Sequence, residues 1–192
     1  MDLFDHEWPA ARTVWVLEPT DTVVVLGSTQ AESILVAGTP AVRRRSGGGA
    51  VLVEPGGLVW VDVFVPAGDP LWEVDVGRAF AWLGGVWAAA LGESAHAHAG
   101  PLITTPWSKL VCFAGLGPGE VTIDGAKVVG IAQRRTKAGA LFQCAALLDW
   151  RPERLLERLA LTDDARRRAA ADLAGVARGV AVNADAFVNH LP

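Results

Sequence analysis

The chain has 192 residues, of which 51% are hydrophobic and 20% are charged, and its formal net charge at pH 7 is −4. This length and composition predict one globular domain with a substantial hydrophobic core. The net negative charge excludes an overall positive field of the kind that attracts nucleic acid, so the arginines at 43–45 are a local feature.

The same sequence predicts a cytoplasmic protein that does not span a membrane. The longest uncharged stretch of helical character, AFAWLGGVWAAALG, covers only 79–92 and is shorter than the ~20 residues that a bilayer requires. The first residues, MDLFDHEWPAAR, lack the basic and apolar regions of a secretory signal. Cys112 and Cys144 are therefore expected to be reduced thiols.

Strands are predicted to dominate the first two-thirds of the chain. RTVWVLE (12–18) and TVVVLG (22–27) are rich in β-branched residues and are separated by turn residues. TQAESILVAG (29–38) is predicted to form a short helix that ends at Gly38. Asp62 is a charged residue inside an otherwise apolar run. Three more strands are expected, at PAVRRR (40–45), AVLVE (50–54) and LVWVDVFV (58–65).

The second part of the chain mixes helices and strands. The apolar spacing from Pro70 to Leu91 predicts a helix, although its glycines lower the helix propensity. The stretch 92–109 is polar and irregular. In EVTIDGAKVVG (120–130), Asp124-Gly125 lies between two alternating runs and predicts a two-residue hairpin turn. Two further strands, LVCFAG (110–115) and ALFQCAALLDW (140–150), and two helices within 151–179 are also predicted.

This order of elements predicts the fold class. Long blocks of strands, with helices between and after them, favour an α+β fold in which a mixed, largely antiparallel sheet is packed by helices. There is no internal repeat and no linker in the sequence. We therefore expect one domain over residues 1–192.

The segment VRRRSGGGAV (42–51) places three arginines beside three glycines. Consecutive glycine N–H groups can turn toward one anion, and neighbouring arginines would add charge-assisted hydrogen bonds. A flexible hairpin with a solvated basic flank explains the same residues. Neither a Walker loop nor a GxGxxG motif is present, so the segment alone leaves both interpretations open.

A second segment, KVVGIAQRR (127–135), begins directly after the predicted hairpin turn. Lys127 at the start of this strand could bridge phosphate and carboxylate oxygens, or it could be an ordinary lysine of an edge strand. Cys112 is expected in an apolar strand, where a free cysteine is usually a small buried hydrophobe. It would become a nucleophile if a cation such as Lys127 lowered its pKa.

The remaining candidate residues have common structural explanations. His96 and His98 in HAH could ligate a metal, but no further His or Cys cluster supports them, so no metal site is predicted. Most of the eight tryptophans are expected in the core, and some could line an apolar pocket.

In their order and spacing, RRRSGGGAV (43–51) and KVVGIAQRR (127–135) together resemble the lipoate–protein ligase family, which is grouped with biotin ligases and octanoyltransferases. Members of that family carry an Arg-Arg-x-Ser/Thr-Gly-Gly-Gly-Ala-Val loop and a later Lys-x-x-Gly-x-Ala-Gln strand. VVVLGSTQ (23–30) resembles the Leu-Gly-x-x-Gln strand end of the same family. The resemblance covers roughly residues 12–150.

The resemblance implies a biotin/lipoate ligase-like catalytic domain without the accessory C-terminal domain of many ligases. It implies that ATP, with Mg, activates lipoate or octanoate as an acyl-adenylate, which a lysine of a lipoyl domain or a glycine-cleavage carrier protein then attacks. Lys127 would hold the phosphate and carbonyl oxygens. The other implied substrate- and adenylate-binding residues are Arg44, Arg45, Ser46, Gly47, Gly48, Gly49, Ala50, Gly130, Ala132 and Gln133.

The sequence also departs from the family, and three hypotheses stay open. The family's usual His-Asp and Gly-Asn after the glycines are replaced by LVEPGG (52–57), and a later His-Gly-Ser/Thr segment reads Cys144-Ala145-Ala146. A cysteine at the position of Cys112 is typical of a branch of octanoyltransferases that needs no ATP. The hypotheses are an ATP-dependent ligase, which the triple glycine favours, a Cys112-dependent octanoyl- or lipoyltransferase, and a non-catalytic member that binds an acyl compound or a nucleotide.

Overall fold

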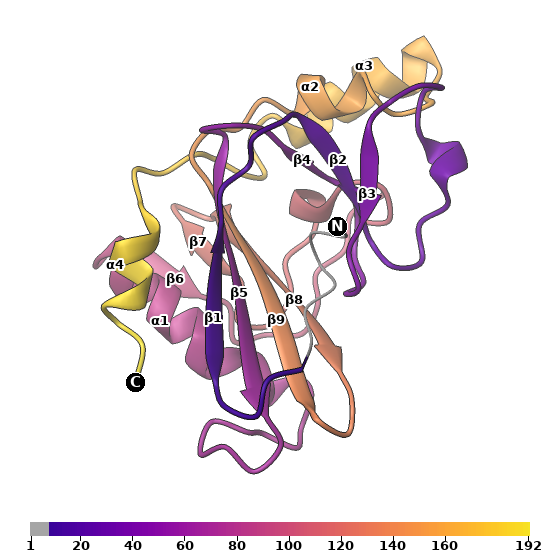
Figure 1. Cartoon of the computed structure of the whole chain (residues 1–192). Helices are drawn as coiled ribbons and strands as arrows, with labels where there is room; N and C mark the ends of the chain where they lie inside the picture. Colours follow the sequence, from indigo (N-terminus) through magenta and orange to yellow (C-terminus); the bar gives the residue numbers. More distant parts are fainter. Residues whose placement is uncertain (1–7) are drawn as a thin grey trace.

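The computed structural model describes residues 8–192 and contains two sheets (Figure 1). The large sheet has six strands in the order β1-β5-β9-β8-β7-β6, and every neighbouring pair is antiparallel. In the small sheet, β2 pairs with β3 in parallel and with β4 in antiparallel orientation. The strands are β1 Thr13–Leu17, β2 Val23–Leu26, β3 Ala41–Arg43, β4 Val51–Val53, β5 Leu58–Pro66, β6 Ala95–Ala97, β7 Val121–Ile123, β8 Ala126–Arg135 and β9 Gly139–Leu147.

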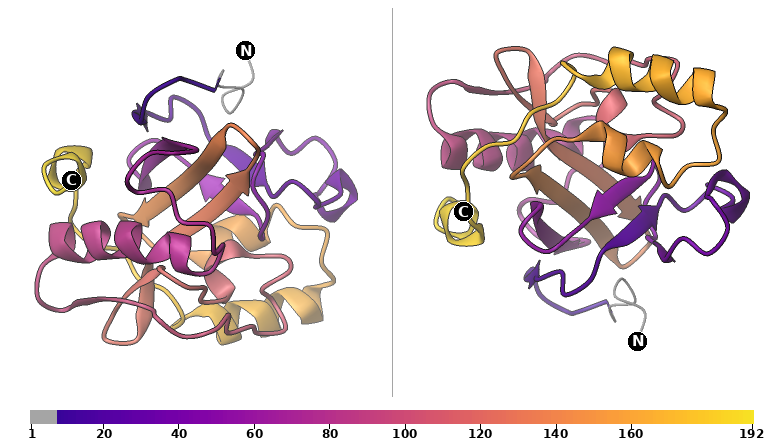
Figure 2. Two further views of the ribbon diagram at one scale, coloured as in Figure 1. Left: turned by 90° about the horizontal axis from the view of Figure 1, so that it is seen from below. Right: turned by 90° about the horizontal axis from the view of Figure 1, so that it is seen from above.

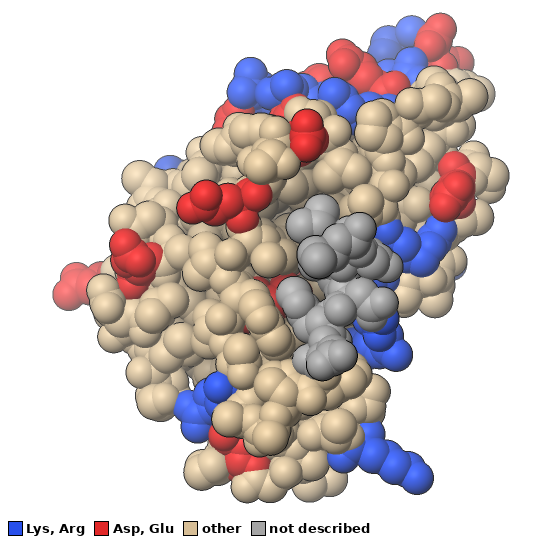
Figure 3. Space-filling model, in the orientation of Figure 1, with Lys and Arg blue, Asp and Glu red and all other residues tan. Residues whose placement is uncertain are grey.

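Helices cover the two sheets from both sides. The α-helices are α1 Ala81–Leu91, α2 Pro152–Leu156, α3 Asp163–Leu173 and α4 Ala184–Val188. In Figure 2, α1 runs across the strands of the large sheet. Charged side chains gather over α2 and α3 in Figure 3, where Arg166 and Arg167 pair with Asp163 and Asp164. The predicted α+β fold with a mixed, largely antiparallel sheet is therefore confirmed.

Strand alternation explains how these layers pack. One face of β5 and β9 is buried against α1 and α4, for example through Val61 and Phe142. The opposite face packs on the small sheet, where Trp60 meets Val25 and Val53. The next side chains along β2 point the other way, toward α2 and α3. Successive strand residues face opposite sides. Both faces of β5, β9 and β2 are covered, which accounts for the high apolar content of these strands.

The predicted hairpin is confirmed, and it contains a bulge that the sequence did not indicate. Asp124 and Gly125 both have positive φ, 51° and 79°, as a two-residue primed turn requires. The pairing then shifts, because Thr122 lies opposite Lys127 while Val121 lies opposite Val129. The extra residue places Val128 and Val129 in the same core, beside α1. Lys127 is thereby directed to the opposite face of the sheet.

Three predicted elements differ from the structure. The helix expected at 29–38 is only a 3₁₀ turn, Glu32–Ile34. The helix expected from Pro70 begins later. The Asp75 carboxylate accepts the N–H of Arg78, a 3₁₀ turn follows at Arg78–Phe80, and regular α-helix starts only at Ala81. The strand expected at 110–115 is a 3₁₀ helix, Cys112–Ala114.

The remaining differences concern short elements. Part of the irregular stretch 92–109 pairs as β6, which contains His96. The two helices predicted after residue 151 are confirmed as α2 and α3, and α4 was not predicted. Among the described residues, no helix is both long and apolar enough to cross a membrane.

We expect Phe187→Ala to destabilise the fold. Phe187 anchors α4, since its ring is fully buried and lies 4.4 Å, centroid to centroid, from the ring of Trp87 in α1. Loss of this ring should lower the free energy of unfolding by about 3 kcal/mol, measured by chemical denaturation. Val188→Ala is the matched control, because Val188 is 41% exposed. Equal effects of the two substitutions would contradict the anchoring role.

Candidate functional site

A cavity of about 860 Å³ lies along the edge of β8. Among the described residues, β7 pairs with β8 only as far as Val129, so the edge of β8 beyond it faces the cavity. The walls come from segments that are far apart in sequence. Of the predicted site residues, those that line it are Gly47, Gly48, Gly49, Cys112, Lys127, Ala132 and Gln133.

The glycine segment is a crossover loop and not a hairpin turn. The strands that it joins, β3 and β4, lie on either side of β2 and do not pair with each other. The loop is docked against the segment before Cys112: Ala50 N donates to Leu110 O at 2.8 Å, and Cys112 N donates to Ala50 O at 3.0 Å. A Cβ on Gly49 would lie 2.5 Å from the carbonyl carbon of Val111. Glycine is therefore required at 49 by close backbone approach.

Arg44 binds this loop on the side that faces away from the cavity. The side chain is buried, and its Nη2 donates to Gly47 O at 2.7 Å and to Gly49 O at 2.9 Å. In a trans peptide the following N–H points away from the carbonyl oxygen, so the Gly48 N–H is directed away from Arg44. Among the described residues this N–H has no acceptor, and Gly48 lines the cavity. The loop can thus offer an N–H group to an anion.

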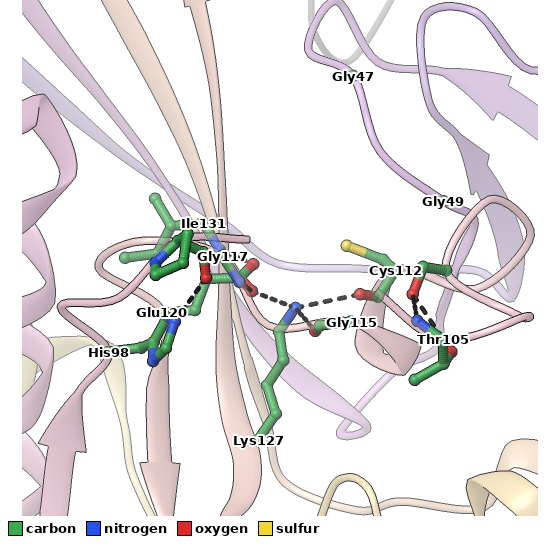
Figure 4. A network of polar contacts seen from close by, with 12 residues as sticks. Gly47, Gly49, His98, Thr105, Cys112, Gly115, Gly117, Glu120, Lys127 and Ile131 are labelled. Atoms are coloured by element: carbon green, nitrogen blue, oxygen red, sulfur yellow. Dashed lines mark hydrogen bonds and ion pairs between the residues drawn. The ribbon is translucent and has the colours of Figure 1, made fainter. Parts of the chain in front are cut away.

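Lys127 is buried (Figure 4). The segment that contains Cys112 lies between it and the glycine loop. Its Nζ donates to Cys112 O at 3.1 Å and to Gly115 O at 3.0 Å, and it pairs with Glu120 Oε2 at 2.7 Å. An ammonium group has three N–H donors, so all three are engaged here. A ligand oxygen would have to replace one of these partners.

Glu120 is a site residue that the sequence reasoning missed. Its Oε1 accepts the N–H of Ile131 at 3.1 Å and its Oε2 accepts the N–H of Gly117 at 2.6 Å. The carboxylate therefore caps the open edge of β8 and neutralises Lys127 at the same time. The available signal was an acidic residue directly before the first strand of the hairpin, two positions from Thr122, which lies opposite Lys127.

The two cysteines occupy different environments. Cys112 lines the cavity, and in Figure 4 its sulfur points into the space between Glu120 and the glycine loop. Lys127 donates to the carbonyl oxygen of Cys112 and not to its thiol. Cys144 is fully buried on the α1 side of β9, and this burial raises the pKa of its thiol. Only Cys112 is placed to react with a molecule in the cavity.

Of the other predicted residues, Ala132 and Gln133 line the cavity and the rest do not. The carboxamide of Gln133 is buried at the cavity wall and has no hydrogen-bond partner among residues 8–192. Gly130 lies beside the lysine but does not line the cavity, and a Cβ there would be in van der Waals contact with Lys127 Cε at 3.4 Å. Arg44, Arg45, Ser46 and Ala50 lie behind or beside the loop and do not line the cavity.

The described residues bring together no group of three or more His, Cys, Asp or Glu side chains that could hold a metal ion. His98 Nε2 contacts Pro101 O at 2.9 Å, and His96 lies in β6. Of the described residues that line the cavity, Glu120 alone carries a carboxylate, and both of its oxygens accept backbone N–H groups.

The sequence matches the family model described as the lipoyl protein ligase A/B catalytic domain over residues 3–182. A search of curated proteins finds no match. Among solved structures, the chain is similar to a bipartite lipoate protein ligase from Thermoplasma acidophilum, studied with its E2 lipoyl domain as part of an archaeal lipoylation system. The TM-score is 0.69 and the identity 19%, over 93% of this chain and 68% of that chain.

Two other solved structures share the fold. A T. acidophilum protein with bound lipoic acid has a TM-score of 0.64 and 18% identity, covering 97% of this chain and 71% of that chain. A lipoate-protein ligase A bound with ATP has a TM-score of 0.58 and 19% identity, covering 88% of this chain and 66% of that chain. At these identities the likeness establishes the fold alone.

Gly49→Ala should disrupt the docked loop. The added methyl group would overlap the backbone of Val111 and Cys112, so we expect a loss of about 3 kcal/mol in the free energy of unfolding, measured by denaturation. Gly47→Ala is the control, because apart from its two chain neighbours no described residue has an atom within 4 Å of its Cβ position. A Gly49→Ala protein as stable as the control would show that the close approach is not needed.

Alkylation by iodoacetamide should distinguish the two thiols. We expect mass spectrometry of the native protein to show one modification, at Cys112, because Cys144 is buried and its thiol has a raised pKa. After denaturation both cysteines should react. Native Cys112→Ser should remain unmodified, and modification of Cys144 in that variant would contradict the assigned environments.

Proposed function

The chain belongs to the lipoyl protein ligase A/B catalytic domain family, and from this we propose that it attaches lipoate or a related acyl group to a lysine of a lipoyl carrier domain through an ATP-derived acyl-adenylate. One observation carries the proposal: the glycine loop and Lys127, separated by some eighty residues of sequence, line one cavity. An N–H of the loop and a lysine ammonium are both groups that bind phosphate oxygens.

The proposed reaction has two steps. In the first, a carboxylate oxygen of the acid attacks the α-phosphorus of ATP, a P–O bond forms, and pyrophosphate leaves. In the second, a carrier lysine amine attacks the acyl carbonyl carbon, an amide bond forms, and AMP leaves with the electron pair of the broken C–O bond. Neither step needs a nucleophile from the protein, so positioning and charge stabilisation are what the site supplies.

Each cavity residue then has a role. The Gly48 N–H would bind a phosphate oxygen, and the Lys127 ammonium would bind the phosphate and carbonyl oxygens. Because all three donors of Lys127 are engaged, we propose that a phosphate oxygen takes the place of the Glu120 carboxylate. The unpartnered Gln133 carboxamide is free to bond a polar group of the ligand.

The cavity also offers room for an apolar acyl chain. Part of its wall is hydrophobic, with Ile34, Phe80, Leu102 and Ile131 among the lining residues. Burial of such a chain is favourable by roughly 0.8 kcal/mol per methylene. A chain of the length of octanoate or lipoate would therefore gain several kcal/mol in this cavity.

Structures of relatives support the choice of substrates. One contains lipoic acid, another contains ATP, and a third was studied with its E2 lipoyl domain. We propose the same substrate classes here, with the lipoyl domain or a glycine-cleavage carrier protein as acceptor. Mg would enter with the ATP phosphates, because Glu120 is the single carboxylate among the described cavity residues and both of its oxygens accept backbone N–H groups.

The position of Cys112 favours a second candidate function. Its sulfur lies in the same cavity as Lys127 and the glycine loop. In this alternative, the thiolate attacks an acyl thioester of a carrier, the carrier thiol leaves, and the acyl group then passes from Cys112 to a protein lysine without ATP. A stable acyl–Cys112 thioester, seen as a mass increase, would distinguish this route.

The decisive experiment incubates the protein with a lipoyl domain, with and without ATP and Mg, and with lipoate, octanoate or biotin, followed by intact mass spectrometry of both proteins. The ligase proposal predicts an ATP-dependent mass increase on the lipoyl domain and acid-dependent pyrophosphate exchange. Cys112→Ser should keep this activity if the protein is a ligase. If Cys112 carries the acyl group, transfer should instead need an acyl thioester donor in place of ATP and should be lost in Cys112→Ser. Ligand-induced stabilisation without any transfer would instead indicate a binding protein.

A test of Lys127 by substitution must also replace its ion-pair partner Glu120. Lys127→Met alone would leave the Glu120 carboxylate buried and unpaired, at a cost of about 3–5 kcal/mol in stability. Lys127→Met combined with Glu120→Gln removes both charges, so we expect a folded protein that has lost pyrophosphate exchange by at least a hundredfold. Glu120→Gln alone is the control for the carboxylate. Full exchange activity in the folded double variant would overturn the role of Lys127.

A further inference from the structure

Asp62 is a charged residue in the interior that the proposed chemistry does not use. It lies on β5 with 0% of its surface exposed. Its Oδ1 accepts the N–H of Trp60 Nε1 at 2.7 Å, and its Oδ2 accepts from Gln143 Nε2 at 3.1 Å. Burial of a carboxylate is costly unless hydrogen bonds compensate it. The two donors therefore stabilise the carboxylate in the interior.

The hydrogen bonds continue from Asp62 to the glycine loop. Gln143 lies opposite Asp62 on β9, and its Oε1 accepts from Ser46 Oγ at 2.7 Å. Ser46 Oγ in turn accepts from Arg44 Nε at 3.1 Å. Arg44 then donates to Gly47 O and Gly49 O. All four side chains of this chain, Asp62, Gln143, Ser46 and Arg44, are at most 3% exposed.

The two ends of the chain determine the direction of every hydrogen bond in it. A carboxylate can only accept and a guanidinium can only donate. Gln143 must therefore turn its NH₂ toward Asp62 and its oxygen toward Ser46. The Ser46 hydroxyl must then give its hydrogen to Gln143 and accept from Arg44. No flipped arrangement of the amide satisfies both ends, so the chain has one stable state.

We propose that Asp62 and Gln143 are positioning residues for the glycine loop. Through Ser46 they hold Arg44, which keeps the carbonyl groups of Gly47 and Gly49 turned inward and so presents the Gly48 N–H to an anion in the cavity. The inference rests on the proposed function in one respect, that the anion is a phosphate group of ATP or of the acyl-adenylate. The orientation of the loop itself can be tested without any ligand.

Asp62→Asn tests the proposal directly, because it keeps the shape of the side chain and reverses the direction of the hydrogen bond between position 62 and Gln143. The introduced carboxamide would retain an oxygen for Trp60 and turn its NH₂ toward Gln143, whose amide would then flip and present NH₂ to Ser46. Ser46 would lose its acceptor. We expect faster hydrogen exchange in the peptide spanning residues 44–50 and roughly tenfold weaker ATP binding by calorimetry, the effect of about one lost hydrogen bond.

The double variant Asp62→Asn/Gln143→Glu should restore both properties. A glutamate at 143 accepts from the carboxamide introduced at position 62 and from Ser46, so the chain regains its original direction with the negative charge moved by one residue. A merely structural role for Asp62 does not predict this rescue. Val61→Ala is the matched control: Val61 is buried next to Asp62 but faces α1, so its loss should lower the melting temperature without changing loop exchange or ATP affinity.

Each outcome decides between the alternatives. Unchanged loop exchange in Asp62→Asn would overturn the proposal, as would an equal loss of ATP affinity in Val61→Ala. Restored exchange protection in the double variant would support it even if the wild-type protein bound no ATP. In that last case the positioning role would stand, and the ATP-dependent function would be what had failed.

Discussion

The site depends on the docking of the glycine loop against the segment that leads to Cys112. Two backbone hydrogen bonds, from Ala50 to Leu110 and from Cys112 to Ala50, join segments that are about sixty residues apart in the chain. Lys127 is then tied to the same segment through Cys112 O and Gly115 O. The glycine amide, the lysine and the thiol share one cavity because these backbone contacts place them there.

Two buried polar systems support this arrangement in different ways. Glu120 neutralises Lys127 and at the same time accepts from Ile131 and Gly117, so the lysine is held at the cavity wall. The chain from Asp62 to Arg44 holds the other wall of the cavity. Buried charges of this kind contribute little net stability, and their value is geometric: they specify where a small number of donors point.

This geometry also explains why one site supports two candidate reactions. Stabilising an acyl-adenylate requires donors near its phosphate and carbonyl oxygens, which Lys127 and the loop can supply. Acyl transfer through Cys112 requires similar donors around a thioester carbonyl. The reactions differ in whether ATP or a thioester delivers the acyl group, and this difference lies in the ligands and not in the framework.

The sequence alone determined those elements that depend on residues close together in the chain. The Asp124-Gly125 turn, the strands rich in β-branched residues and the two helices after residue 151 follow from turn chemistry and side-chain spacing, and the two glycine and lysine motifs indicated the family. Tertiary structure decided the rest. The bulge that redirects Lys127, the helical turn at Cys112, the ion pair with Glu120 and the inward orientation of Arg44 all arise from contacts between distant segments. Those contacts outweigh the small local preferences that a sequence window reports.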